Sequence, residues 1–248
     1  GCILQLIAIK VDRHRPFEHF SFRTAPDKQR LFQILKWSVP IGIESMFFTV
    51  LTMVTSRFVA AFGADAIAVS RVGSQIESLS WLIGGGFGSA LTAFMGQNYG
   101  AGKWFRIRRC FKIASVTMLV WGVIITLLLT LAAPLLFSVF IKESHIIEMG
   151  ATYLRILSFC QIAMCLESVS SGSFKGIGKT LEPSVVSITS NALRVPLSYF
   201  LSKTSLGLNG IWIGVCLGAV LRGAWSYIWY LIVSRRLPTV DDTTIQKE

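Results

Sequence analysis

Six long apolar stretches divide this sequence, and short segments rich in lysine, arginine and glycine separate them. Each stretch is near or above the roughly 20 residues that an α-helix needs to cross a bilayer. The pattern therefore predicts an all-α membrane protein with six transmembrane helices. The stretches lie near residues 35–62, 66–96, 113–141, 150–171, 184–201 and 209–233.

The composition also favours a membrane protein. Of the 248 residues, 52% are hydrophobic and only 15% are charged, with a formal net charge of +11. A soluble domain usually carries about 25% charged residues, whereas low charge with a basic excess is typical of membrane proteins with cationic loops. The chain starts with glycine, and its first residues, GCILQLIAIKV, are typical of the end of another apolar helix. We therefore expect a fragment, or a chain trimmed at its N-terminus.

The distribution of basic residues predicts the orientation in the membrane. If successive loops alternate sides, seventeen lysines and arginines fall on one side, and only Lys142 and Lys203 fall on the other. Short loops rich in lysine and arginine stay in the cytoplasm, so both termini are predicted to be cytoplasmic, in a bacterial-type inner (plasma) membrane. Topology explains the net charge, and no aromatic residues interleave with a basic patch on a soluble face, so nucleic acid is excluded as a partner.

Two glycine-rich segments share the pattern G-x-x-x-G-x-G-K: GQNYGAGK at residues 96–103 and GSFKGIGK at residues 172–179. A nucleotide-binding P-loop has a different glycine spacing and follows a β-strand, so neither segment fits one. Each follows a predicted span on the same side of the membrane, where glycine closes a helix in the left-handed conformation. The recurrence indicates a weak repeat of two-helix units. Four further glycines are expected to let helices approach closely: Gly84, Gly85, Gly86 and Gly88.

Chemistry that needs a metal, a thiol or a catalytic base has no candidate set inside the spans. The five cysteines form no C-x-x-C pair, and the three histidines fall outside the apolar stretches. We therefore predict that the protein is not an enzyme and needs no cofactor.

The segments together resemble the multidrug and toxic compound extrusion (MATE) family. Residues 75–103, QIESLSWLIGGGFGSALTAFMGQNYGAGK, are similar to the family's eighth helix and the loop after it. Residues 172–183, GSFKGIGKTLEP, resemble the loop after its tenth helix, and residues 191–201, NALRVPLSYFL, resemble its eleventh helix. The basic stretch of residues 10–36 is similar to the connector between the family's two lobes. The resemblance covers nearly the whole chain and concerns the C-terminal lobe only.

This resemblance implies a fold and a function. The six helices would form one lobe of a twelve-helix, two-lobe transporter, with the missing N-terminal lobe or a second copy as partner. Residues 1–30 would be the end of a preceding helix plus the basic cytoplasmic connector, residues 31–236 the six-helix lobe, and residues 237–248 a polar cytoplasmic tail. The transporter would exchange H⁺ or Na⁺ for cationic, amphipathic organic compounds by alternating access.

Three acids within the apolar stretches, and three arginines at comparable depth, are the candidates for its mechanism: Glu44, Glu77, Glu167, Arg71, Arg194 and Arg222. A charge at the bilayer centre costs about 2.5–3.5 kcal/mol on insertion scales, so these residues are expected to face the bundle interior, to pair, or to line a wet cavity. A flippase for lipid-linked oligosaccharides, the nearest alternative, would favour a cavity rich in arginine and lysine, whereas these charges balance. A non-transporting membrane scaffold is a second alternative, and it predicts no effect of Glu44→Gln beyond stability.

Glu44 is the first candidate for ion coupling or substrate binding. It follows Pro40 by four residues, on the same helical face, and Pro40 removes a backbone hydrogen bond and is expected to kink the helix. A carboxyl group buried there can exchange a proton, or bind Na⁺ or a cationic substrate. The resemblance implies that Glu167 shares a cation with Glu44. The structural alternatives are an ion pair of Glu44 with a buried arginine, and a Glu167 carboxylate that simply reaches water.

Glu77 is the third candidate, and it needs a partner from another helix. Arg71 precedes it by six residues, a poor spacing for one helical face, and Gln75 precedes it by two. Arg194 is expected either to orient a carboxylate or to anchor helix packing. Asn191, three residues before Arg194, suits a cavity or a packing role equally.

Overall fold

The structure, a computed structural model, describes residues 27–238, except for the side chain of Arg30. The chain divides into two compact units, Gly1–Lys36 and Trp37–Glu248. The predicted connector at residues 1–30 and the predicted tail at residues 237–248 lie, all but a few residues, outside the described range. Within that range every regular element is a helix, which confirms the all-α prediction.

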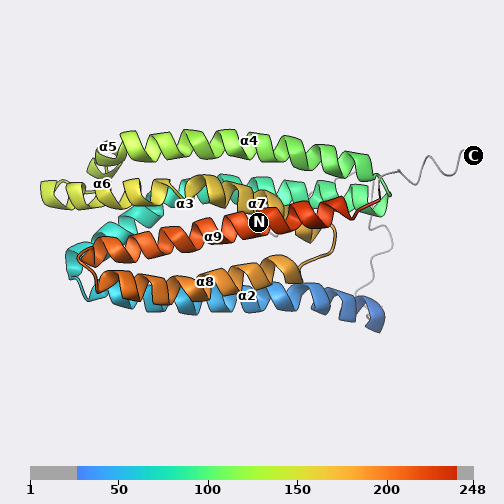
Figure 1. Cartoon of the computed structure of the whole chain (residues 1–248), viewed down its shortest axis with the longest axis horizontal. Coiled ribbons are helices and arrows are strands. Elements are labelled where there is room, and N and C mark those ends of the chain that lie inside the picture. The colour runs from blue at the N-terminus through green and yellow to red at the C-terminus, as the bar shows by residue number, and fades with distance from the viewer. Residues whose placement is uncertain (1–26, 239–248) are drawn as a thin grey trace, which may run out of the picture. The chain divides into compact units, whose positions relative to one another are not determined.

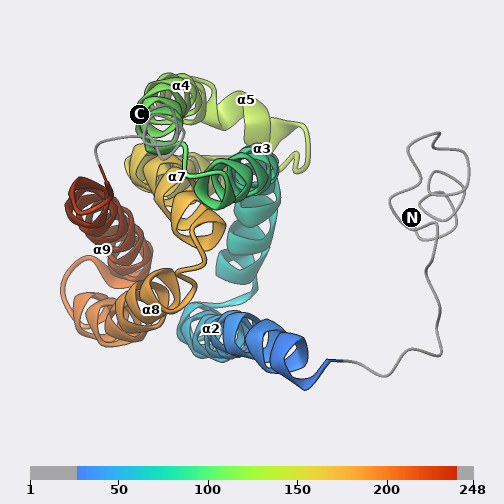
Figure 2. The same ribbon diagram turned by 90° about the vertical axis from the view of Figure 1, so that its right-hand side faces the viewer.

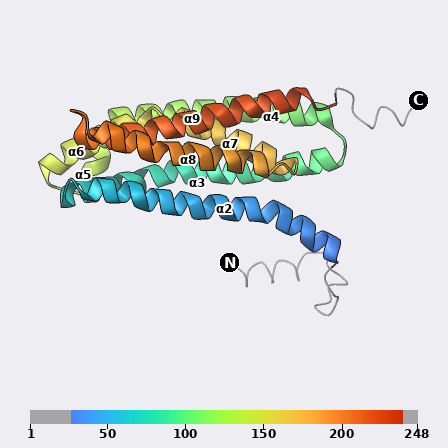
Figure 3. The same ribbon diagram turned by 60° about the horizontal axis from the view of Figure 1, so that its bottom comes forward.

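The long helices of the second unit run side by side along one direction (Figures 1 and 3). Seen end-on, α7 lies between α3, α4 and α9 and packs against each of them, while α8 packs against α9 (Figure 2). The described helices are α2 (Lys28–Ala60), α3 (Ala64–Gly100), α4 (Trp104–Leu131), α5 (Ala133–Ser138), α6 (Ser144–Ser158), α7 (Gln161–Gly176), α8 (Leu181–Ser202) and α9 (Gly207–Arg235).

Several of these helices have the length and composition of membrane spans. Within the described residues, α2, α3, α4 and α9 are each long and apolar enough to cross a bilayer. The pair α6 and α7, bent by 46° across a short break, meets the same test of length and composition when the two helices are taken together. The 22 residues of α8 occupy the remaining predicted stretch. The predicted stretches thus recur as α2, α3, α4 with α5, the α6–α7 pair, α8 and α9, and the stretch predicted at residues 113–141 is divided where α4 ends at Leu131.

The two glycine-rich segments form the same turn. Two residues after α3 and α7 end, a glycine adopts a positive φ, 65° at Gly102 and 76° at Gly178. This confirms the predicted helix-closing role, because a left-handed backbone is unfavourable for residues with a Cβ atom. The next N–H donates to a carbonyl five residues back, at 2.9 Å in both turns: Lys103 to Asn98, and Lys179 to Phe174.

Small residues let α3 and α7 approach closely, along a line that we name the α3–α7 seam: Gly88, Thr92, Ser168 and Gly172. A Cβ atom added to Gly88 would lie 2.8 Å from Ser168 Oγ, and one added to Gly172 would lie 2.6 Å from the Gly88 carbonyl oxygen. Thr92 Oγ1 donates to the Gly172 carbonyl at 3.0 Å. Close approach is therefore confirmed at Gly88. An added Cβ would meet no atom within 4 Å at two of the other predicted glycines: Gly85 and Gly86.

A break interrupts the span predicted at residues 150–171, which is not one continuous helix. α6 ends at Ser158 and α7 begins at Gln161, although neither proline nor glycine occurs between them. Hydroxyl groups of α4 satisfy polar groups at the break. Thr126 Oγ1 donates to the Ser158 carbonyl at 3.1 Å, and Thr130 Oγ1 donates to Ser158 Oγ at 2.9 Å. Bonds of this kind stabilise irregular backbone at membrane depth.

The apolar core of the second unit consists of two main clusters. One lies toward the α2–α3 turn and α5, and includes Phe137, Tyr153 and Trp212. The other lies toward the two glycine turns, and includes Phe111 and Tyr230. Between these clusters, polar side chains gather around a cavity.

Candidate functional site

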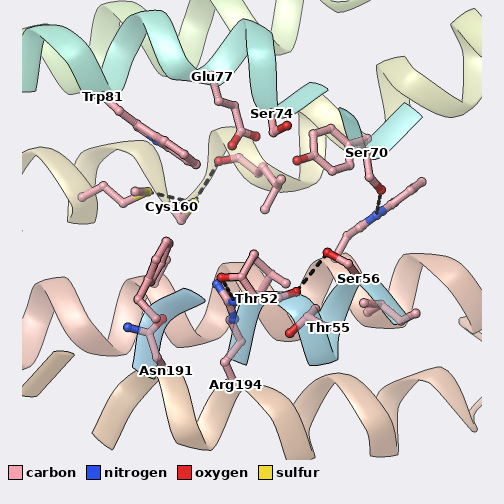
Figure 4. A pocket seen from close by; sticks show the side chains of 18 of the residues that line it. Thr52, Thr55, Ser56, Ser70, Ser74, Glu77, Trp81, Cys160, Asn191 and Arg194 are labelled. Carbon is pink, nitrogen blue, oxygen red and sulfur yellow. Dashed lines mark hydrogen bonds between the residues drawn. The ribbon is translucent and has the colours of Figure 1, made fainter. Parts of the chain in front are cut away.

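A cavity of about 880 Å³ lies among α2, α3, α8 and α9, with the α6–α7 break in its wall (Figure 4). On α2, α3 and α9 its lining residues fall within 48–60, 67–85 and 211–222, and α6, α7 and α8 contribute the rest of the lining. These ranges lie in the half of the second unit near the α2–α3 turn, away from the two glycine turns. The volume is within the usual range for sites that hold small organic molecules.

Six charged side chains line this cavity, four arginines and two glutamates: Arg57, Arg71, Glu77, Glu167, Arg194 and Arg222. Arg222 Nη2 lies 3.8 Å from Glu167 Oε2, and these two side chains are 15% and 21% exposed. Of the charges predicted to face the interior, all but Glu44 line the cavity. Arg57, near the end of α2, is a charged residue that the prediction did not include.

Glu77 has very little contact with solvent, and one oxygen of its carboxyl is unsatisfied by the described residues. Only 3% of the residue is exposed, and its Oε1 atom has no hydrogen-bond partner in the described part of the chain. Nearby groups are the phenol of Tyr153 and the thiols of Cys160 and Cys216. An ionised carboxyl left unpaired in such surroundings is costly, and a bound proton or cation removes that cost. Glu77 is therefore the group in this cavity best placed to take up a small cation.

Arg194, on α8, faces Glu77 from the opposite side of the cavity (Figure 4). Its Nη2 atom donates to Thr52 Oγ1 at 3.2 Å, and its guanidinium carbon lies 6.0 Å from the centre of the Phe48 ring. A Cβ atom added to Gly218 would lie 2.9 Å from Arg194 Cβ, so this glycine of α9 leaves room for the arginine stem. Contacts with α2 thus hold the guanidinium at the cavity, and α9 packs against its aliphatic stem.

The other polar residues predicted near the site differ in their positions. Asn191 lines the cavity, and its Nδ2 atom donates to the Ser187 carbonyl at 2.8 Å, which holds the amide against its own helix. Arg71 lines the cavity and is exposed. Gln75 is exposed on α3 and is not among the lining residues of the described chain.

Glu44 lies apart from this cavity. Ser184 Oγ of α8 donates to Glu44 Oε2 at 2.9 Å, so its carboxyl is engaged between α2 and α8. Pro40 lies inside α2 without ending it. Glu44 stands one helical turn before Phe48, the first α2 residue of the lining, whereas Glu167 is part of the lining. The structure therefore does not bring Glu44 and Glu167 into one site.

Sequence reasoning missed most of the uncharged lining, although one part of it carries a readable signal. Along α3 the lining residues recur every three or four positions, which places them on one helical face: Ser70, Ser74, Glu77, Trp81 and Gly84. The break between α6 and α7 has no comparable signal. Gln161, at the break, contributes an amide group to the lining. Tyr153 of α6 and Trp212 of α9 contribute aromatic rings beside it.

The cavity combines carboxyl groups, guanidinium groups, hydroxyls and aromatic rings. Ionisable residues at membrane depth typically mark the path of an ion or a substrate, and aromatic rings stabilise organic cations. Within the described residues, no group of three or more His, Cys, Asp or Glu side chains is arranged to hold a metal ion. The arrangement suits reversible binding of a small ion and an amphipathic molecule.

Comparison with known proteins identifies similar sequences over most of the chain. A family model described as MatE matches residues 40–200. The probable multidrug resistance protein NorM of Thermotoga maritima is 26% identical over 201 residues, which are 80% of this chain and 43% of that protein. The probable multidrug resistance protein YoeA of Bacillus subtilis is 24% identical over 211 residues, 82% of this chain and 45% of the relative. The chain thus spans about half the length of the curated relatives it matches.

Solved structures share the fold. A MATE crystal structure in the straight conformation superposes with a TM-score of 0.85 at 20% identity, over 95% of this chain and 54% of the other. A MOP superfamily transporter from Pyrococcus furiosus gives a TM-score of 0.84 at 20% identity, over the same shares of the two chains. That second protein is described as having a binding pocket of reverse polarity, which suggests a different function for it.

Proposed function

This chain belongs to the MatE family, and from that premise we propose that it is the C-terminal six-helix lobe of a multidrug exporter in the plasma membrane. The observation that carries the proposal is the buried carboxyl of Glu77, whose Oε1 atom has no hydrogen-bond partner among the described residues, at a cavity lined by aromatic and charged groups. Relatives named as multidrug resistance proteins favour organic compounds as its substrates. A second lobe, either the N-terminal half or another copy, would complete the translocation path.

The proposed mechanism is competition between a coupling ion, H⁺ or Na⁺, and an organic cation for the carboxyls of the cavity. Uptake of either cation at Glu77 offsets the cost of burying an unpaired carboxylate. A cation that approaches Glu167 competes with Arg222, which lies 3.8 Å away. If ion and substrate each favour a different arrangement of the two lobes, their competition exchanges one for the other across the membrane.

Orientation follows from the basic segments. Short loops rich in lysine and arginine remain in the cytoplasm, so the two glycine turns and both termini are assigned to that side. The cavity lies in the half of the second unit away from these turns. In this orientation the cavity belongs to the outer half of the membrane, where an exporter releases its substrate and takes up the coupling ion.

The test is binding of an organic cation to the purified chain in detergent, measured by the fluorescence of ethidium with and without Na⁺. We expect Glu77→Gln to weaken ethidium binding by about tenfold, equivalent to roughly 1.4 kcal/mol, because a neutral amide replaces the carboxylate that attracts the cation. Glu148→Gln is the matched control, since Glu148 is exposed on α6. Equal binding by the Glu77→Gln variant and the parent chain would reject Glu77 as the cation site.

Whether a second lobe exists is tested separately, by the mass of the native polypeptide in its source membrane. A band at about twice the 27.4 kDa of this chain supports the two-lobe exporter. A band near 27.4 kDa contradicts a covalently joined second lobe and leaves pairing with another copy. Cross-linking in the membrane then distinguishes a dimer from a single lobe.

One observation favours a second candidate function, the export or flipping of an anionic amphipath such as a lipid-linked oligosaccharide. The balance expected from three acids and three arginines does not hold in the cavity, because Glu44 lies outside and Arg57 joins the lining. Four arginines then face two glutamates. The same titration with an anionic dye separates the two candidates: tighter binding of the anion than of ethidium would favour the second.

A further inference from the structure

A second hollow, of about 970 Å³, lies between the first turns of α4 and the last turns of α9. We name it the α4–α9 groove. Its lining comes from both helix ends: Phe105, Ile107, Arg108, Arg109, Phe111, Lys112, Ser115 and Val116 on α4, and Tyr227, Tyr230, Leu231, Ser234 and Arg235 on α9. It shares no lining residue with the central cavity, so it is a separate feature of the molecule.

The groove is strongly basic. Four cationic side chains line it: Arg108, Arg109, Lys112 and Arg235. No acidic residue lies among its lining residues, and neither α4 nor α9 contains an aspartate or glutamate. Arg108 is partly engaged, because its Nη2 atom donates to the carbonyl oxygens of Leu237 at 2.5 Å and Pro238 at 3.2 Å. The other three cations, Arg109, Lys112 and Arg235, can contribute positive charge to the binding of an anion.

Aromatic rings close the groove toward the core. The Phe111 ring lies 4.4 Å from the Tyr230 ring and 5.5 Å from the Tyr227 ring, measured between ring centres. Deeper in the span the lining includes the exposed apolar side chains of Val116 and Leu231, beside Ser115 and Tyr227. The cations of the groove thus lie nearer the helix ends than Val116 and Leu231 do, which matches the order of headgroup and acyl chain in a phospholipid.

We propose that the α4–α9 groove binds one anionic phospholipid. Its phosphate lies against Arg109, Lys112 and Arg235, and an acyl chain runs along Val116 and Leu231. Basic pockets between the ends of membrane helices bind lipid headgroups of this kind, and each lysine or arginine near the surface contributes a factor of about five in affinity. A free phosphate would use the cations alone, whereas a lipid also occupies the apolar part of the groove.

The test is native mass spectrometry of the full chain, released from detergent with defined lipids. We expect phosphatidylglycerol to bind at least about tenfold more tightly than phosphatidylcholine, because three cations each contribute a factor of about five. Neutralising the groove with Arg109→Gln, Lys112→Gln and Arg235→Gln should abolish that preference. The matched control neutralises three cations near the same helix ends but outside the groove: Arg106→Gln, Lys175→Gln and Arg236→Gln.

Two further experiments distinguish a bound lipid from a bound free phosphate. Val116→Trp fills the apolar part without changing a charge, and it should weaken phosphatidylglycerol binding as well. Excess glycerol 1-phosphate should not displace the lipid, and full displacement would mean that a free phosphate is the ligand and overturn the proposal. The proposal is also overturned if the control triple variant loses the preference for phosphatidylglycerol as fully as the groove variant does.

Discussion

At the scale of single residues, pairing decides which charges of the cavity can exchange a ligand. Glu167 has Arg222 as a partner, whereas Glu77 Oε1 has none in the described part of the chain. The Nε atoms of Arg194 and Arg222 also lack hydrogen-bond partners there. Buried polar groups normally have hydrogen-bond partners, and an exception typically indicates a place for an ion, a water molecule or a ligand.

Removal of Arg222 should reveal the strength of its pair with Glu167. We expect Arg222→Gln to lower the free energy of unfolding by about 1–2 kcal/mol, less than for a fully buried pair because both side chains retain some exposure. The double variant Arg222→Gln with Glu167→Gln should recover at least half of this loss, since no unpaired carboxylate remains. Thermal unfolding in detergent measures both.

The control for this pair is Lys179→Gln, which breaks the ion pair of Lys179 with Glu182. Those side chains are 45% and 23% exposed, and their closest charged atoms lie 3.6 Å apart. Solvent screens such a pair, so the loss should stay below about 0.5 kcal/mol. A loss as large as that of Arg222→Gln would contradict a special role for the cavity pair.

The sequence could identify the charges of the site but not all of their positions. The cost of a charge facing lipid predicts that interior charges gather, and Glu77, Glu167 and Arg194 do so. Glu44 satisfies the same rule by a hydrogen bond with Ser184, outside the cavity. Which of these two solutions a residue adopts depends on the rotation and depth of its helix, and these are fixed by neighbouring helices rather than by hydropathy. Arg57 escaped prediction because it lies near a helix end.

At the scale of elements, small residues decide where helices meet. The α3–α7 seam brings backbone against backbone, since the Cβ position of Gly172 lies 2.6 Å from the Gly88 carbonyl oxygen. Tight seams of this kind stabilise membrane helices through van der Waals contact and interhelical hydrogen bonds. The seam holds α7 against α3 immediately beside the cavity-lining residues Gly84 and Gly85.

A methyl group added in the α3–α7 seam should lower the stability of the protein. We expect Gly172→Ala to lower the free energy of unfolding by about 1–3 kcal/mol, because the backbone oxygen that it meets cannot move aside as a side chain does. Gly86→Ala is the matched control on α3, where an added Cβ meets nothing within 4 Å. That change should be neutral or stabilise the helix by about 0.5–1 kcal/mol. Thermal unfolding compares the two, and equal losses would refute the seam.

Elements were more predictable than their irregularities. Long apolar runs predict the spans, and glycine followed by lysine predicts the turns at Gly102 and Gly178, because each signal acts locally. The break between α6 and α7 depends instead on hydroxyls of another helix, Thr126 and Thr130, that replace the lost backbone bonds. Contacts between segments distant in the sequence produce no periodic pattern in it, so the break could not be predicted from the sequence.

At the scale of the whole molecule, orientation connects the cavity with the proposed direction of transport. Labelling of single cysteines tests it, in a background where the native cysteines are replaced by alanine. An impermeant maleimide added to intact cells should label Glu143→Cys, which lies between α5 and α6, and should not label Lys179→Cys in the second glycine turn. Labelling of Lys179→Cys from outside would reverse the assigned topology and place the cavity toward the cytoplasm.

Helix α2 differs from the rest of the second unit in how little of it is buried. Only 6% of its span window is buried, against 28% to 39% for α3, α4 and α9. Within the second unit it is tied by a few side-chain contacts, among them Glu44 with Ser184 and Thr52 with Arg194. We therefore expect α2 to dock late during assembly, after α3–α9 have packed against one another.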